Sequence, residues 1–135
     1  MATSNQVFDA SARVFDLLYR DKDTVGEAGW IAKNLRLSSS KKNVSVLEIG
    51  AGTGRHACAF ANAGLSVTAV EPSLEMLERA TAHERVSYLQ GDGRHLRLDT
   101  TFDAVLALFH VVSYQTSFSD AHDFFDTASR HLTSG

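Results

Sequence analysis

An acid and three alternating glycines lie together in the stretch EIGAGTG, as Glu48, Gly50, Gly52 and Gly54. An apolar run precedes them and an Ala-rich helical pattern follows, so they form a strand-to-helix turn at which backbone N–H groups and a positive helix end meet a ligand. The dinucleotide fingerprint requires a small residue where Arg55 stands, and a P-loop requires Gly-Lys-Ser/Thr. An acid at this strand tip favours a ligand that presents a cation or a hydrogen-bond donor there instead of a pyrophosphate.

A second acid closes the next apolar run. Glu71 ends the run in VTAVEPS, about twenty residues beyond the glycines, where dinucleotide folds place a carboxylate on the ribose hydroxyls. Pro72 fixes the exit turn, and Ser73 begins a helix. The sequence therefore predicts Glu71 at the rim of the same site. A third acid, Asp92, follows the third apolar run in LQGDG.

Short apolar runs alternate with helical patterns and must position these residues. The alternation predicts an α/β fold in which a parallel sheet is covered by helices on both faces. Two helices are expected within residues 7–37, and residues 91–101 are expected to form a loop. The expected strands are residues 44–50, 66–71, 86–92 and 102–109, and the expected later helices are residues 55–63, 73–81 and 119–132.

Composition excludes several classes. The chain has 135 residues, 44% hydrophobic and 21% charged, which is typical of one soluble domain. Its net charge is −3 and its basic residues are scattered, so we expect no nucleic-acid partner. No signal peptide or membrane span is visible, so we expect a cytoplasmic protein without a membrane partner. The histidines lack paired spacing, and no metal site is expected.

These motifs resemble those of the class I S-adenosylmethionine-dependent methyltransferases. EIGAGTG has the form of the first motif, E/D-x-G-x-G-x-G, and FDAVLALFHVVSY resembles the fourth. The resemblance implies S-adenosyl-L-methionine as cofactor and a Rossmann-like three-layer sandwich with parallel sheet order 3-2-1-4. Because domains of this family have seven strands, we expect a chain truncated before strands 5–7. Strand four is then an open edge, through which a homodimer would form.

The resemblance also assigns roles to single residues. Asp92 is expected at the adenine amino group, with Gly93 beside it, and Met76 is expected on adenine or in the core. Tyr19 is expected over the cofactor or in the core. His110 is expected as a general base or as a wall residue. The implied catalytic residues are His110 and Tyr19; the implied cofactor-binding residues are Glu48, Gly50, Gly52, Gly54, Glu71, Pro72, Met76, Asp92, Gly93 and Phe109.

The predicted function is transfer of a methyl group to a small polar metabolite, with an amino sugar as the candidate. Residues 1–43 are expected to form an N-terminal helical segment on the acceptor side, and residues 44–135 a partial cofactor-binding domain. One alternative is an NAD-dependent oxidoreductase, against which Arg55 and the lack of a Tyr-x-x-x-Lys pair count. The other is a cofactor-binding fragment without activity of its own.

Overall fold

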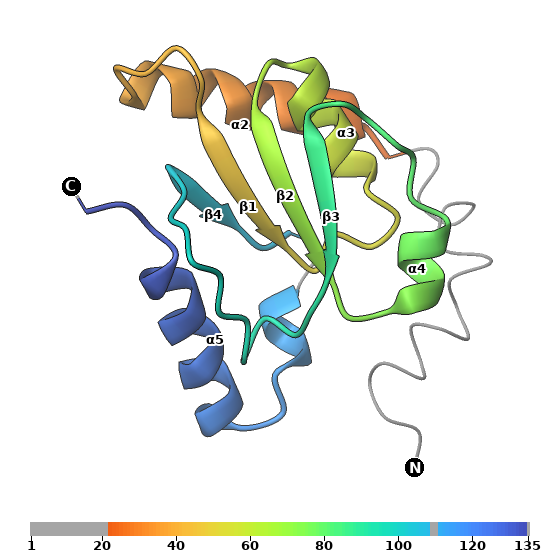
Figure 1. The fold of residues 1–135 in the computed structure, drawn as a ribbon, viewed down its shortest axis with the longest axis vertical. Helices are drawn as coiled ribbons and strands as arrows, with labels where there is room; N and C mark the ends of the chain where they lie inside the picture. Colours follow the sequence, from red (N-terminus) through yellow and green to blue (C-terminus); the bar gives the residue numbers. More distant parts are fainter. Residues whose placement is uncertain (1–21, 109–110, 135) are drawn as a thin grey trace.

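Four parallel strands form a single sheet in the order β3-β2-β1-β4 in the computed structural model, which describes residues 22–108 and 111–134. The strands are β1 (Ser45–Ile49), β2 (Ser66–Glu71), β3 (Val86–Gln90) and β4 (Ala104–Leu106) (Figure 1). The strand order and direction expected from the sequence are confirmed. β2 has its expected bounds, whereas β4 is shorter than residues 102–109.

Side chains cap the amino ends of three helices. In α2 (Thr24–Ser38), α4 (Leu74–Glu78) and α5 (Phe118–Arg130), an Asp or Ser side chain accepts a hydrogen bond from a backbone N–H of the first turn. The remaining helices are α3 (Arg55–Asn62) and the short 3-10 helix η1 (Val111–Tyr114). α4 is shorter than the predicted helix of residues 73–81, and η1 was not predicted.

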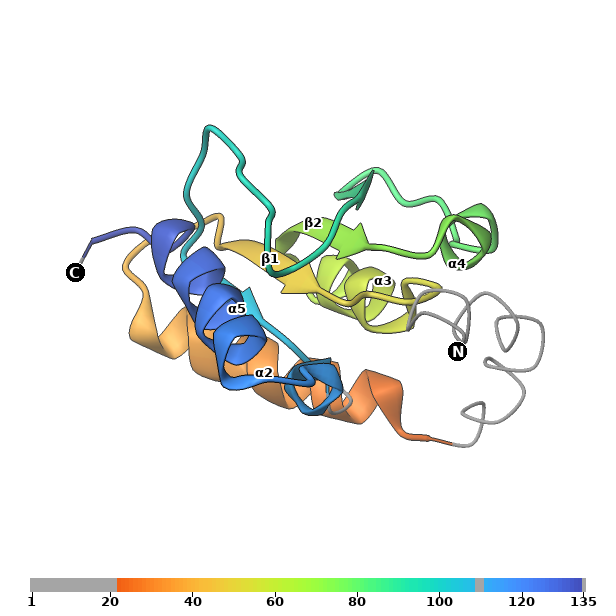
Figure 2. The ribbon, with the colours of Figure 1, turned by 90° about the horizontal axis from the view of Figure 1, so that it is seen from below.

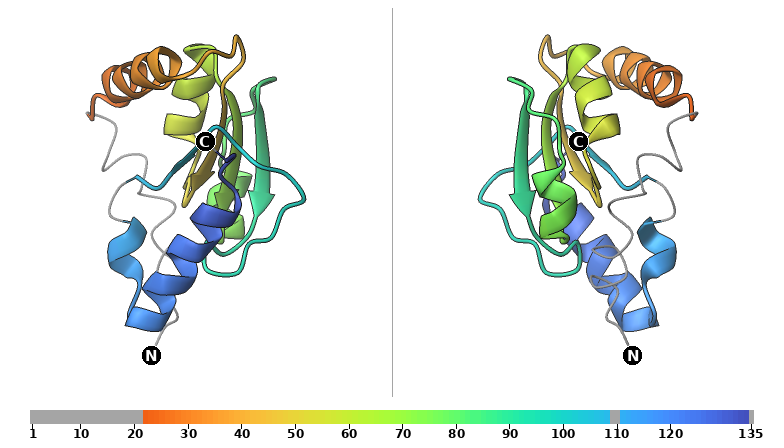
Figure 3. Two further views of the ribbon diagram at one scale, coloured as in Figure 1. Left: turned by 90° about the vertical axis from the view of Figure 1, so that its left-hand side faces the viewer. Right: turned by 90° about the vertical axis from the view of Figure 1, so that its right-hand side faces the viewer.

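Two hydrophobic clusters lie on opposite faces of the sheet and make three layers. On one face, Val46 and Val67 pack with the α3 residue Phe60 and with alanines of α2. On the other face, Leu47 and Ile49 pack with Phe124 of α5. Figure 3 shows α2 beside α3 and α5 apart from both, whereas in Figure 2, which is seen from below, α5 lies in front of α2. Because alternate β1 residues point to opposite faces, both layers depend on the same short strand.

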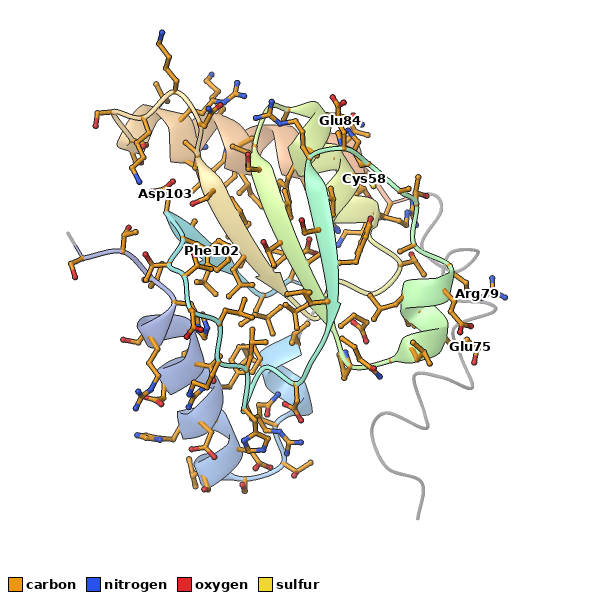
Figure 4. All side chains as sticks on the ribbon, in the orientation of Figure 1. Cys58, Glu75, Arg79, Glu84, Phe102 and Asp103 are labelled. Carbon is orange, nitrogen blue, oxygen red and sulfur yellow. The ribbon has the colours of Figure 1, made fainter. Side chains whose placement is uncertain are left out.

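The amino end of the sheet is fixed by Asp103, far from the glycine loop. The Asp103 carboxylate accepts from the Ser45 backbone N–H at 2.9 Å and pairs with Lys41 Nζ at 2.7 Å. Lys41 holds the pKa of Asp103 below its usual range, with help from the Ser45 N–H. Asp103 and Phe102 lie at the start of β4 in Figure 4. The register of β4 on β1 is therefore fixed before the strand reaches the carboxyl edge.

The carboxyl ends of the strands form the lower edge of the sheet in Figure 1, and the loops of the expected site and η1 lie at this edge. β4 is an outer strand of the described sheet, as expected, and an isolated parallel bridge joins Phe102 to Leu132 just before it. A homodimer through this edge stays a prediction. Within residues 22–108 and 111–134, no helix has both the length and the apolar character needed to cross a membrane.

Candidate cofactor site

The glycine loop between β1 and α3 has a backbone that only glycine adopts easily. Gly50, Gly52 and Gly54 have φ values of +76°, +59° and +80°. A Cβ on Gly50 would lie 2.6 Å from Val111 Cγ2, and a Cβ on Gly54 would overlap the hydroxyl of Tyr88. The loop is thus held between η1 and β3, and its bare backbone lies at the carboxyl edge of the sheet.

Glu71 joins this loop to the next element. It ends β2 with a side chain that is 5% exposed. Its Oε2 accepts from the Gly52 backbone N–H at 2.8 Å, and its Oε1 accepts from the Ser73 N–H at 3.2 Å. A carboxylate oxygen is also the kind of acceptor that ribose hydroxyl groups require. Both the loop and the start of α4 therefore orient this acid.

Glu48 is a second buried acid on the same sheet face. Its residue is 3% exposed, and Oε2 is a buried oxygen without a hydrogen-bond partner in the described part of the chain. Burial, and secondarily the charge of Glu71, raise the pKa of Glu48 to about 8. Because a buried polar atom is normally paired, this oxygen is a candidate partner for a ligand. A cation or donor placed there would remove the cost of burying the carboxylate.

Asp92 lies in the loop after β3 in a different electrostatic setting. Its carboxylate accepts from the backbone N–H and the guanidinium of Arg94, with Oδ2 2.7 Å from Nη2. The side-chain hydrogen bond from Arg94 is the main reason that the pKa of Asp92 lies below its usual range. The next residue, Gly93, is buried, and a Cβ there would lie 2.6 Å from Ile49 Cγ2 and 2.7 Å from Phe124 Cε2. Glycine at this position lets the loop approach the sheet and α5 closely.

The remaining predicted residues are Met76 and Pro72, which the structure describes, and three that it does not. Met76 in α4 is 1% exposed, in keeping with the core alternative. Pro72 is half-buried, and its carbonyl accepts from Gln90 Nε2 at 3.2 Å across the β3 edge. The predicted residues Tyr19, Phe109 and His110 lie outside the described residues. Their roles stay predictions.

A buried histidine and an acid tie α2 to the start of α3, and the sequence analysis did not identify them. His56 Nε2 lies 2.9 Å from Glu27 Oε2, and Lys22 Nζ lies 3.3 Å from Glu27 Oε1. Burial lowers the pKa of His56, while the bond to Glu27 opposes this shift, and the Glu27 carboxylate accepts from Nε2–H because a carboxylate has no proton to donate. The residues are 29 positions apart. No local pattern could have paired them.

The parallel sheet, the glycine turn and the acids at the strand ends define a Rossmann-like domain with a cofactor site at its carboxyl edge. The chain belongs to the methyltransferase domain family, whose model matches residues 46–135. The expected family and fold are therefore confirmed. Family membership also favours the methyltransferase interpretation over the oxidoreductase alternative.

Two relatives are methyltransferases of Streptomyces. The dTDP-3-amino-3,4,6-trideoxy-alpha-D-glucopyranose N,N-dimethyltransferase of Streptomyces venezuelae is 33% identical over 127 residues, 92% of this chain and 53% of the relative. The cypemycin N-terminal methyltransferase of a Streptomyces species is 39% identical over 83 residues, 59% of this chain and 32% of the relative. The chain thus spans about half or less of the length of these relatives.

Solved structures share the arrangement. DesVI of Streptomyces venezuelae is matched with a TM-score of 0.77 and 33% identity, over 90% of this chain and 52% of that chain. The SAM-bound CalS10, an amino pentose methyltransferase from Micromonospora echinaspora, is matched with a TM-score of 0.76 and 29% identity, over 100% of this chain and 55% of that chain. Because the CalS10 match covers the whole chain, it includes the sheet and its carboxyl edge.

Proposed function

We propose that this chain is the donor-binding part of an S-adenosyl-L-methionine-dependent methyltransferase. The observation that carries the proposal is the buried Oε2 of Glu48 beside the glycine loop, which has no hydrogen-bond partner within residues 22–108 and 111–134. The donor's amino acid part has an ammonium group, which would pair with this carboxylate. The positive charge of the ammonium would favour the ionised form of Glu48, which in the free protein keeps its proton up to a pH of about 8.

The other residues of the edge fit the rest of the donor. Glu71, oriented by the Gly52 and Ser73 N–H groups, would accept from the ribose hydroxyls. Asp92 would accept from the adenine amino group, since its lowered pKa keeps it an ionised acceptor. Two buried acids and one ion-paired acid thus match three chemically distinct groups of one ligand.

When bound, the donor supplies a methyl group on a sulfonium that leaves as a neutral thioether. This chain's task is positioning, because displacement at a methyl carbon needs the acceptor in line with the sulfonium. The glycine loop and the acids fix the donor end, and the segment after β4 borders the place for the acceptor. His110 and Tyr19 are proposed on the acceptor side, His110 as a base for an acceptor that arrives protonated.

We propose an amino sugar carried on a nucleotide as the acceptor, with its amino nitrogen as the methylated atom. The support is the similarity to the Streptomyces venezuelae dimethyltransferase and to CalS10, whose descriptions name amino-sugar substrates. A small-molecule acceptor also agrees with the net charge of −3 and with basic residues that are scattered along the sequence.

Methyl transfer tests this proposal. The purified chain is mixed with methyl-labelled donor and dTDP-linked 3-amino sugars, and products are resolved by mass spectrometry. We expect a mass increase of one or two methyl groups on the amino sugar and none on the matched 3-hydroxy sugar. Binding of the donor product with no methylated sugar would leave the donor site standing and favour the alternative of a cofactor-binding fragment without activity of its own. Absence of both would contradict the whole proposal.

A further inference from the structure

Arg94 contacts Asp92 through both its backbone and its side chain. The Asp92 Oδ1 accepts from the Arg94 N–H at 2.8 Å and from Nε at 3.1 Å, and Oδ2 lies 2.7 Å from Nη2. This two-point contact between a guanidinium and a carboxylate fixes the plane of the carboxylate as well as its position. The Asp92 side chain is 36% exposed, so part of it remains accessible although it contacts Arg94.

Arg94 also contacts a different element. Its Nη1 lies 3.3 Å from Oδ1 of Asp120, in the first turn of α5. Asp120 is itself held, because its N–H donates to Ser117 Oγ at 3.0 Å and its Oδ2 accepts from Thr116 Oγ1 at 3.2 Å. The Arg94 guanidinium therefore lies between two carboxylates, that of Asp92 in the loop after β3 and that of Asp120 at the amino end of α5.

We propose that Arg94 is a positioning residue that aims the Asp92 carboxylate at the exocyclic amino group of adenine and so sets base specificity. The inference rests on the proposed function. A carboxylate accepts from an amino group but repels the carbonyl oxygen that replaces it in hypoxanthine. A carboxylate free to rotate would lose this discrimination, whereas one held in a fixed plane keeps it.

The chain offers a matched control in Arg97. This arginine lies in the same loop and also reaches α5, with Nη1 2.9 Å from Thr127 Oγ1 and Nη2 3.3 Å from Asp126 Oδ2. Unlike Arg94, Arg97 makes no hydrogen bond or ion pair with Asp92 among the residues that the structure describes. A role in joining the loop to α5 is common to both arginines, and aiming Asp92 belongs to Arg94 alone.

The test compares two ligands on the full chain by calorimetric titration. S-adenosylhomocysteine carries the amino group, and S-inosylhomocysteine carries an oxygen in its place. We expect wild type to prefer the first by about tenfold, the equivalent of one hydrogen bond to a charged group. Arg94→Ala should reduce the preference to about twofold or less, Arg94→Lys should give an intermediate ratio, and Arg97→Ala should keep the wild-type ratio.

Each remaining outcome is decisive. If Arg94→Ala weakens both ligands equally and keeps their ratio, Arg94 is only structural and the inference is overturned. If wild type binds both ligands alike, Asp92 does not recognise the amino group, and the inference also fails. If wild type binds neither, the proposed function itself fails. Should Arg94→Ala not fold, Arg94→Lys and Asp120→Asn provide the ratio, and an unchanged ratio in both would overturn the inference.

Discussion

Two acidic corners of the same sheet edge are built in opposite ways. At one, Glu48 and Glu71 are buried and lie on one sheet face, and the pKa of Glu48 is raised to about 8. At the other, Asp92 is part-exposed and paired with Arg94, which lowers the pKa of Asp92. In the first corner, Oε2 of Glu48 has no hydrogen-bond partner in the part of the chain that the structure describes. The second is already neutralised by the protein.

This difference suggests that the two corners contribute to donor binding in different ways. Backbone N–H groups of Gly52 and Ser73 orient Glu71, so the acid and the glycine loop are linked directly. Removing Glu71 would therefore disturb the loop as well as the acid. A side-chain ion pair near the surface orients Asp92, and such pairs contribute little to stability. We therefore expect the buried corner to supply most of the donor affinity and the exposed corner to supply specificity. The following variants test this division, beginning with the largest expected effect.

Glu71→Ala should weaken S-adenosylhomocysteine binding by at least about a hundredfold, or about 2.7 kcal/mol, because it removes acceptors for two hydroxyls and frees the loop. Glu71→Gln keeps one acceptor oxygen and should lose less. Calorimetric titration gives both affinities, and thermal unfolding shows whether the fold survives. An affinity for Glu71→Ala within about threefold of wild type would contradict the ribose role.

Gly54→Ala should lower the free energy of unfolding by about 1–3 kcal/mol, because its φ of +80° strains an alanine and the added Cβ meets Tyr88. Gly29→Ala is the matched control, since no atom lies within 4 Å of its added Cβ in α2. That substitution should stabilise the protein by about 0.5–1 kcal/mol. Urea unfolding measures both, and equal effects would contradict the packing seen at the loop.

Glu48 should make donor binding depend on pH. With a pKa of about 8 in the free protein, Glu48 must lose its proton to pair with a cation, so affinity should rise with pH up to about 8 by at most about tenfold per unit. Glu48→Gln should flatten this slope. Titration of both proteins with S-adenosylhomocysteine across this range checks it, and parallel slopes would exclude Glu48 as the source.

The same shift has the opposite sign for stability without ligand. The folded protein holds the Glu48 proton more tightly than the unfolded chain, so the free energy of unfolding should fall as pH rises from the ordinary value of 4.5 to about 8. Glu48→Gln should remove this part of the fall, as urea unfolding at several pH values would measure. No difference between the two proteins would mean that Glu48 is not buried as described.

The sequence predicted the strands and their order well because they follow from local patterns, and the roles of the acids at the strand ends stay predictions. Apolar runs ended by glycine or an acid fixed β1 and β2, and Ser73 fixed the start of α4. Contacts between distant segments were not predictable from periodicity. The pairing of His56 with Glu27 and that of Arg94 with Asp120 depend on how α2 and α5 pack on the sheet. The contact between Arg94 and Asp92 is different, because the two residues are only two positions apart and a local pattern could have indicated it.

Asp92→Asn should have the smallest effect, weakening S-adenosylhomocysteine binding by about three- to tenfold, because an amide keeps one acceptor oxygen but loses the charge. Arg94 lowers the pKa of Asp92, so any stability from the pair is present above the ordinary carboxyl pKa and lost as pH falls through the lowered value. Wild-type binding should thus show no Asp92 titration near neutral pH. A difference between the pH slopes of wild type and Asp92→Asn there would contradict the pairing.

Whether this sheet edge binds the methyl donor can be measured by calorimetric titration of the wild-type chain. The chain is titrated with S-adenosylhomocysteine and, separately, with NAD. We predict saturable one-to-one binding of S-adenosylhomocysteine and no measurable heat with NAD. Binding of NAD, or of neither ligand by a chain that unfolds cooperatively, would contradict the account.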